Sequence, residues 1–169
     1  MTAQRIAFRV IVILTVCLGQ VGVVNRMRLP GGGPDLLLLV VVAFSLVSGP
    51  QRGAVLGFGA GLTADLIPPA DHLAGQLAFA YTAVGYLVGL IDTGEDASVL
   101  TTILAVAGAS IAVVMLYAGL GALVGDGRIS ASATLHSILG TVVYDVLLAP
   151  LIVPLVVAGA RRLEPVGPR

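Results

Sequence analysis

Asp145 and Asp65 are the charged residues set most deeply in apolar parts of the sequence, and they are the first candidates for chemistry. Asp145 lies in the run HSILGTVVYDVLLAPLIVPLV, ten positions after Leu135, which is about 15 Å along a helix at 1.5 Å per residue. A charge at that depth in a bilayer costs roughly 3 kcal/mol or more, so the carboxyl group has to face other protein groups or carry a proton. Three interpretations are open for Asp145 and its neighbour Tyr144: a buried hydrogen-bonded group, a polar cavity or a proton-coupled site. The first is favoured, because no Glu, Lys or His lies at a matching depth in another apolar stretch.

Asp65 ends the run GAVLGFGAGLTAD, in which Gly53, Gly57 and Gly61 recur at every fourth position. Each step of four residues advances a helix by about 40° beyond a full turn, so the glycines and Asp65 share one broad face. Glycines at this spacing let two helix backbones approach closely in a membrane. The pattern therefore predicts packing inside a helical bundle, and the alternative is a docking face for another membrane protein.

Asp65 also needs a partner, because a carboxylate near the C-terminal end of a helix opposes the helix macrodipole. Pro68 and Pro69 stop the helix just after it. Arg26 and Arg28 are predicted to lie on the same side of the membrane, so an ion pair or hydrogen bond between helices is the favoured interpretation. A polar contact with a partner protein or a ligand is the alternative.

Other polar residues have simpler predicted roles, set by the apolar stretches that hold them. Asp35 follows Pro34 at the start of the second stretch and is predicted to cap its helix by accepting backbone N–H groups. Arg9 lies one turn inside the first stretch and is predicted to extend to the cytoplasmic interface. Pro150 and Pro154 should kink the last helix. The four tyrosines fall inside spans and are expected to pack or hydrogen-bond internally: Tyr81, Tyr86, Tyr117 and Tyr144.

The sequence contains no catalytic or phosphate-binding motif. It has no Ser-His pair in the expected order, no H-E-x-x-H and no phosphate loop, and the glycine-rich GFGAG lies inside an apolar stretch with no strand before it. His72 and His136, even with Asp71 and Asp126 nearby, lack the spacing of metal ligands. We therefore predict a protein that is not an enzyme and that needs no metal or cofactor.

The elements that position these residues are apolar helices. Of the 169 residues, 57% are hydrophobic and 11% are charged, and the mean hydropathy is +1.05; soluble domains carry about 25% charged residues. The formal net charge of zero does not suggest a nucleic-acid partner. We predict an all-α integral membrane protein, a bundle of six transmembrane helices forming a single domain over residues 1–169. The spans are expected at roughly 6–24, 34–48, 53–67, 73–91, 98–124 and 135–160.

The arginines predict the orientation of these spans, because cytoplasmic loops are enriched in positive charge. With the N-terminus inside, six arginines fall on the cytoplasmic side and three outside. Both termini are therefore predicted to be cytoplasmic. The cytoplasmic arginines are Arg5, Arg9, Arg52, Arg161, Arg162 and Arg169, and the external ones are Arg26, Arg28 and Arg128.

Residues 34–89 carry a family resemblance, in PDLLLLVVVAFSLVSGPQRGAVLGFGAGLTADLIPPADHLAGQLAFAYTAVGYLVG. A Pro-Asp start to a leucine-rich span, a Gly-Pro-x-x-Gly turn and a glycine-rich span ending in Asp65 come in that order, followed by Gly75 and Gly85-Tyr86. In this order the segment resembles the bacterial rod shape-determining protein MreD family. Relatives often have Asn where this chain has Asp145.

The resemblance implies a non-enzymatic membrane scaffold or regulatory subunit of the cell-elongation complex, which directs rod shape and peptidoglycan synthesis in the bacterial cytoplasmic membrane. It implies MreC as binding partner, and RodA, a class B penicillin-binding transpeptidase and MreB as further members of the complex. The family is also similar in fold to the S components of energy-coupling-factor transporters. A substrate-binding S component is therefore the alternative function, disfavoured because the body of the first stretch is rich in Ile, Val and Leu rather than small residues.

Overall fold

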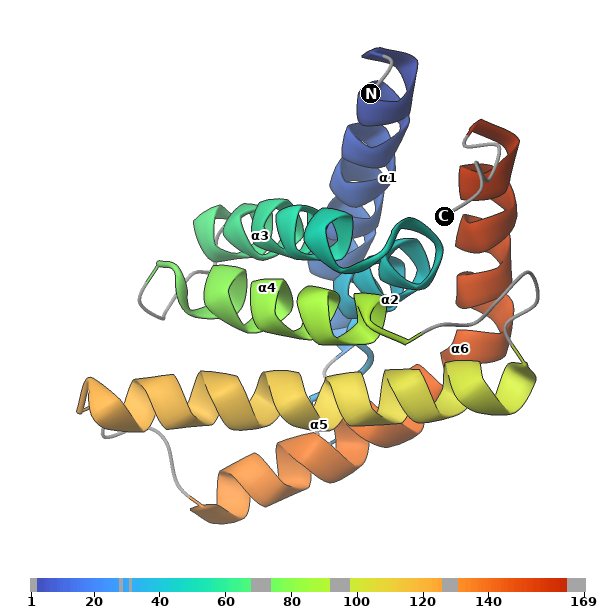
Figure 1. The fold of residues 1–169 in the computed structure, drawn as a ribbon. Helices are drawn as coiled ribbons and strands as arrows, with labels where there is room; N and C mark the ends of the chain where they lie inside the picture. Colours follow the sequence, from blue (N-terminus) through green and yellow to red (C-terminus); the bar gives the residue numbers. More distant parts are fainter. Residues whose placement is uncertain are drawn as a thin grey trace.

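The described chain folds into six α-helices, the number predicted, in a computed structural model (Figure 1). The structure describes residues 3–27, 29–30, 32–67, 74–91, 98–125 and 131–163. A short 3₁₀-helix, Val24–Met27, follows the first helix. The α-helices are α1 (Ala3–Gly22), α2 (Leu36–Ser48), α3 (Pro50–Leu66), α4 (Gln76–Gly89), α5 (Val99–Leu123) and α6 (Ala131–Leu163).

Helix α2 is the centre of the molecule. Its sequence, LLLLVVVAFSLVS, is apolar on every side, and residues 37–46 are all buried. A helix that is apolar all round is stable when other elements cover all its faces. Helix α2 packs against each of the other five α-helices. The remaining helices therefore form a single layer around it.

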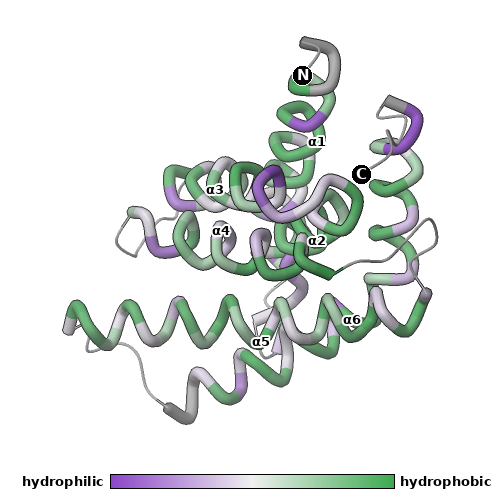
Figure 2. Tube along the Cα trace, viewed as in Figure 1, coloured by the Kyte–Doolittle hydropathy of each residue, from purple (hydrophilic) through white to green (hydrophobic). Residues whose placement is uncertain are grey.

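The surrounding helices expose apolar side chains outward. Leu18 of α1, Leu104 of α5 and Leu155 of α6 are 70%, 63% and 72% exposed, and hydrophobic residues recur along these helices in Figure 2. Within the described residues, two helices are long and apolar enough to cross a membrane, over Val99–Leu123 and Thr134–Arg162, and Ile6–Gly22 and Leu36–Ser48 are shorter apolar helices. Helix α2, with 13 residues, is only about 20 Å long at 1.5 Å per residue.

The helices are not all parallel, in contrast to a simple bundle. In Figure 1, the axes of α3, α4, α5 and the first part of α6 are roughly aligned, while α1 and the last part of α6 lie across them. Helix α6 changes direction part-way along, and Pro150 and Pro154 both lie inside it. Proline removes a backbone hydrogen bond and clashes with the preceding turn, so the predicted kink is confirmed. The start of α1 and the end of α6 lie on the same side of the molecule (Figure 1).

The predicted position of Arg9 is wrong, because its side chain turns into the protein. Arg9 is 4% exposed. Its Nη2 donates to Ser48 Oγ at 2.9 Å, and its guanidinium lies 5.7 Å from the centre of the Phe44 ring. Both partners are in the C-terminal part of α2, where the macrodipole also favours a cation. These contacts tie α1 to the central helix.

Candidate functional site

A polar junction lies inside the molecule where α2 begins, and Asp145 is at its middle. Asp145 is fully buried. The Asp35 backbone N–H donates to Asp145 Oδ1 at 2.7 Å, and Ser110 Oγ of α5 lies 2.6 Å from Asp145 Oδ2. The three residues come from three different parts of the chain, so the junction joins α6 to α5 and to the start of α2.

Asp35 adds a second carboxyl group to this junction and caps α2 as predicted. Its side chain accepts from the Leu38 backbone N–H at 3.0 Å. The Tyr81 hydroxyl of α4 donates to its other oxygen at 2.5 Å. A carboxylate at a helix N-terminus satisfies unpaired N–H groups and is stabilised by the macrodipole.

Gln20 of α1 completes the junction. Its Nε2 donates to Pro34 O at 2.9 Å, and its Oε1 accepts from the Leu36 backbone N–H at 3.0 Å. The N–H groups of Leu36 and Leu38 at the start of α2 are thus paired with side chains. This pairing is what allows a helix to begin inside a membrane-like interior, where an unpaired backbone group costs several kcal/mol.

The junction differs from the prediction in its members. Asp35, which was predicted only to cap a helix, contacts Asp145 directly and places a second carboxyl group beside it. Tyr144 is only half-buried, and the hydroxyl beside the carboxyl groups belongs to Tyr81. Gln20 and Ser110 were missed as site residues. In the sequence, each of them is a polar side chain in an apolar helix. Its role cannot be assigned until the helix that faces it is known.

The tyrosines give the first test of this junction. Tyr81→Phe removes the hydroxyl that donates to Asp35, and a hydrogen bond to a charged group contributes about 2 kcal/mol. We expect thermal unfolding in detergent to show a loss of that size. Tyr86→Phe is the matched control, because Tyr86 of the same helix is 46% exposed, contrary to its predicted internal packing. Its effect should stay within about 0.5 kcal/mol, and equal losses in both variants would contradict the assigned role of Tyr81.

A second feature is the seam between α3 and α4, which is built on the predicted glycine stripe. A Cβ at Gly57 would overlap the Tyr81 carbonyl group, at 2.6 Å from its carbon, and a Cβ at Gly61 would lie 2.6 Å from Ala78 Cα. Gly53 faces Gly85, with each placed against the carbonyl oxygen of the other. The glycines therefore let the two antiparallel backbones touch, and no side chain separates them.

Asp65 closes this seam at the end where α4 begins. It is 2% exposed. Its Oδ2 accepts from the backbone N–H groups of Gly75 at 2.8 Å and Ala78 at 3.0 Å, and its Oδ1 accepts from Leu77 N–H at 3.2 Å. The carboxylate opposes the dipole of its own helix but meets the positive N-terminal end of α4. Its partner in the described chain is thus a helix start on the neighbouring helix.

The remaining predicted residues lie elsewhere or outside the described part. Arg26 is exposed in the 3₁₀-helix, and His136 is exposed on α6. Within the described ranges, no group of three or more His, Cys, Asp or Glu side chains could hold a metal ion. Eight residues named above fall outside those ranges: Arg28, Pro68, Pro69, Asp71, His72, Asp126, Arg128 and Arg169.

These features define the class of the protein. Apolar helices that expose apolar side chains, a buried helix start satisfied by other helices and a glycine seam are typical of helical membrane proteins. Within that class, residues 3–162 match the family described as rod shape-determining protein MreD. The chain belongs to the MreD family, and it is a non-enzymatic membrane protein with a role in determining rod shape, in the context of the cell-elongation machinery. No curated protein and no solved structure shows a significant match to it.

Proposed function

We propose that this chain is a membrane scaffold of the cell-elongation complex and binds MreC directly, with RodA, a class B penicillin-binding transpeptidase and MreB as further members. The observation that carries the proposal is the family match over residues 3–162. The build of the fold is consistent with a scaffold. Helices are joined by backbone contact at the α3–α4 seam and by side-chain hydrogen bonds at the polar junction, which suits a rigid subunit that holds partners in place.

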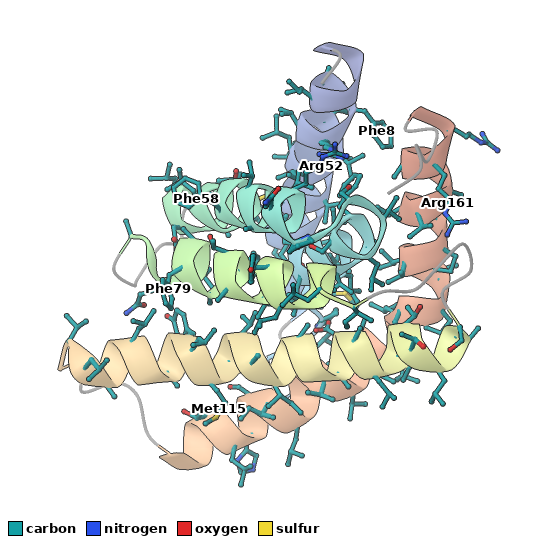
Figure 3. The ribbon with its side chains drawn as sticks, in the orientation of Figure 1. Phe8, Arg52, Phe58, Phe79, Met115 and Arg161 are labelled. Atoms are coloured by element: carbon teal, nitrogen blue, oxygen red, sulfur yellow. The ribbon has the colours of Figure 1, made fainter. Side chains whose placement is uncertain are left out.

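The proposed arrangement in the cytoplasmic membrane embeds all six helices in the bilayer as one S-component-like domain, with both termini in the cytoplasm. Six arginines against three support this orientation. Arg52 and Arg161 are exposed and lie toward the side where α1 begins and α6 ends (Figure 3). Phe58 and Phe79 lie at the other end of the α3–α4 pair in the same view, away from Arg52.

Within this scaffold, we assign Gly53, Gly57, Gly61 and Asp65 to the packing of α3 on α4 rather than to direct contact with a partner. Helix α4 covers the face of α3 on which these four residues lie. Asp35 and Asp145 are assigned to internal support of α2 for the same reason. Arg26, which is exposed, and Arg28 are kept as candidates for partner contact on the external side.

Co-purification tests the proposal. The tagged chain, extracted from the bacterial membrane in mild detergent, is expected to retain MreC, and a tagged multi-span protein of the same membrane is the control for non-specific extraction. Recovery of MreC or RodA above that control supports the scaffold. Recovery of ATPase-linked transport subunits together with a tightly bound vitamin would instead identify an S component.

The orientation has its own test. A reporter that works only in the cytoplasm is fused to each terminus in turn, and both fusions are expected to be active. A periplasmic C-terminus would overturn either the number of spans or their direction.

A further inference from the structure

The hydroxyl group that contacts Asp145 has one hydrogen but lies within hydrogen-bonding distance of two acceptor oxygens. Ser110 Oγ lies 3.0 Å from the carbonyl oxygen of Val106, one turn earlier in α5, and 2.6 Å from Asp145 Oδ2. A serine hydroxyl has a single hydrogen and can also accept. If that hydrogen goes to Val106, as is usual for serine in a membrane helix, the short contact with Asp145 needs a hydrogen from the carboxyl group.

The two carboxyl groups of the junction differ in their donors. Both oxygens of Asp35 receive hydrogens from other groups, the Leu38 N–H and the Tyr81 hydroxyl. Asp35 also lies at the positive end of α2, which favours its ionised form. Asp145 receives the Asp35 N–H on Oδ1 at 2.7 Å, and among the described residues its Oδ2 contacts the Ser110 hydroxyl, whose single hydrogen Val106 O also competes for. Its Oδ2 is therefore the oxygen on which a proton completes the network.

The surroundings of Asp145 also disfavour a second negative charge. The described titratable groups that interact with the pair are the Tyr81 hydroxyl of α4 and, facing Tyr81, the buried Cys17 thiol of α1. Helix α5 contributes the neutral Ser110, and the charged residues of α3, Arg52 and Asp65, lie near its two ends. Two adjacent carboxyl groups in a buried site commonly share one proton, because both cannot ionise cheaply.

We propose that Asp145 is a proton-binding site: in the folded protein Oδ2–H donates to Ser110 Oγ, Ser110 donates to Val106 O, and Asp35 is ionised. The hydrogen bond made by the bound proton links α6 to α5, while the hydrogen bond accepted by Oδ1 links α6 to the start of α2. The folded protein then holds one proton more at this site than the unfolded chain does at neutral pH. This proposal does not depend on the identity of the partners.

Infrared spectroscopy of the purified protein tests the proton directly. Wild type at neutral pH is expected to show the carbonyl band of a protonated carboxylic acid, and Asp145→Asn is expected to lose it. Ser110→Ala should keep the band but shift it to higher frequency, because the acid loses its acceptor. A wild-type spectrum without this band, or a band that persists in Asp145→Asn, would overturn the assignment.

The pH dependence of unfolding gives an independent test. Because the folded state holds the extra proton, raising the pH favours the unfolded state, by up to about tenfold in the equilibrium constant per pH unit. Asparagine can accept from Asp35 N–H and donate to Ser110, so Asp145→Asn mimics the protonated acid. The stability of wild type relative to Asp145→Asn should therefore fall as the pH rises from acidic to mildly alkaline. A difference that stays constant over that range would show that Asp145 is ionised.

Asp35→Asn is the matched control. Both Asp35 oxygens receive hydrogens, and an amide has only one oxygen, so this variant is expected to lose stability at every pH. If Asp35→Asn proved neutral and Asp145→Asn destabilising at every pH, the two carboxyl groups would have the opposite assignment.

Discussion

Gly57→Leu is expected to unfold the bundle, and Gly59→Leu is expected to leave it folded. At Gly57 even a Cβ would overlap the Tyr81 carbonyl group, with its carbon at 2.6 Å, whereas nothing lies within 4 Å of a Cβ at Gly59. The obstacle at Gly57 is backbone, which cannot rotate away as a side chain can. Helices α3 and α4 would have to separate along their length, and the loss would extend to the other glycines of the stripe.

The alanine variants give the size of this effect. Overpacking by one methyl group in a tight core costs about 1–3 kcal/mol, so Gly57→Ala and Gly61→Ala are each expected to lose at least about 2 kcal/mol. Gly59→Ala should be neutral or stabilising by up to about 1 kcal/mol, because alanine is the better helix former. The measurement is thermal unfolding of the purified protein in one detergent.

The outcome separates two roles for the glycines. If Gly57→Ala and Gly59→Ala behaved alike, the α3–α4 seam would not be a site of close packing. If Gly57→Ala kept full stability but lost MreC in co-purification, the stripe would be a docking face instead.

Asp65→Ala is expected to have the second largest effect. The carboxylate accepts three backbone N–H groups at the start of α4, from Gly75, Leu77 and Ala78. Each buried donor left unpaired costs about 1–3 kcal/mol, so the combined loss should be about 3 kcal/mol or more. Leu66→Ala is the control, because the neighbouring Leu66 side chain is 65% exposed.

Asp65→Asn should be intermediate, since the amide keeps one oxygen to accept. It is expected to weaken assembly with partners more than membrane insertion, because removing a charge lowers the cost of insertion. The amount of protein in the membrane fraction measures insertion, and co-purified MreC measures assembly. A variant that recovers MreC as well as wild type does would argue against a polar role for Asp65.

Several features of the fold could be read from local sequence. The six apolar stretches became six helices, the Asp35 cap formed where Pro34-Asp35 predicted it, and the prolines of α6 lie in the helix that bends. Each of these depends on residues a few positions apart. Hydropathy, capping and proline geometry act over that distance and need no knowledge of the neighbouring helices.

Partners of polar side chains could not be read in the same way. Asp35 and Asp145 are 110 positions apart and meet through one hydrogen bond, while Arg9 and Ser48 are 39 apart. A buried polar group takes whichever donor or acceptor its neighbouring helix presents, and that choice follows from crossing angle and register. Arg9 illustrates the point, because the hydroxyl and ring of α2 proved to be the nearer partners.

The sequence by itself therefore determined the membrane class of the chain, its helices, the glycine face that ends in Asp65 and the family to which it belongs. Only the tertiary structure decided that the glycine face meets α4, that Asp65 caps that helix, and that Asp145 shares a junction with Asp35, Tyr81, Ser110 and Gln20. The physical reason is the sequence separation over which each kind of interaction acts. Helix formation and burial in lipid are encoded locally, whereas pairing of buried polar groups is set by how distant helices pack around α2.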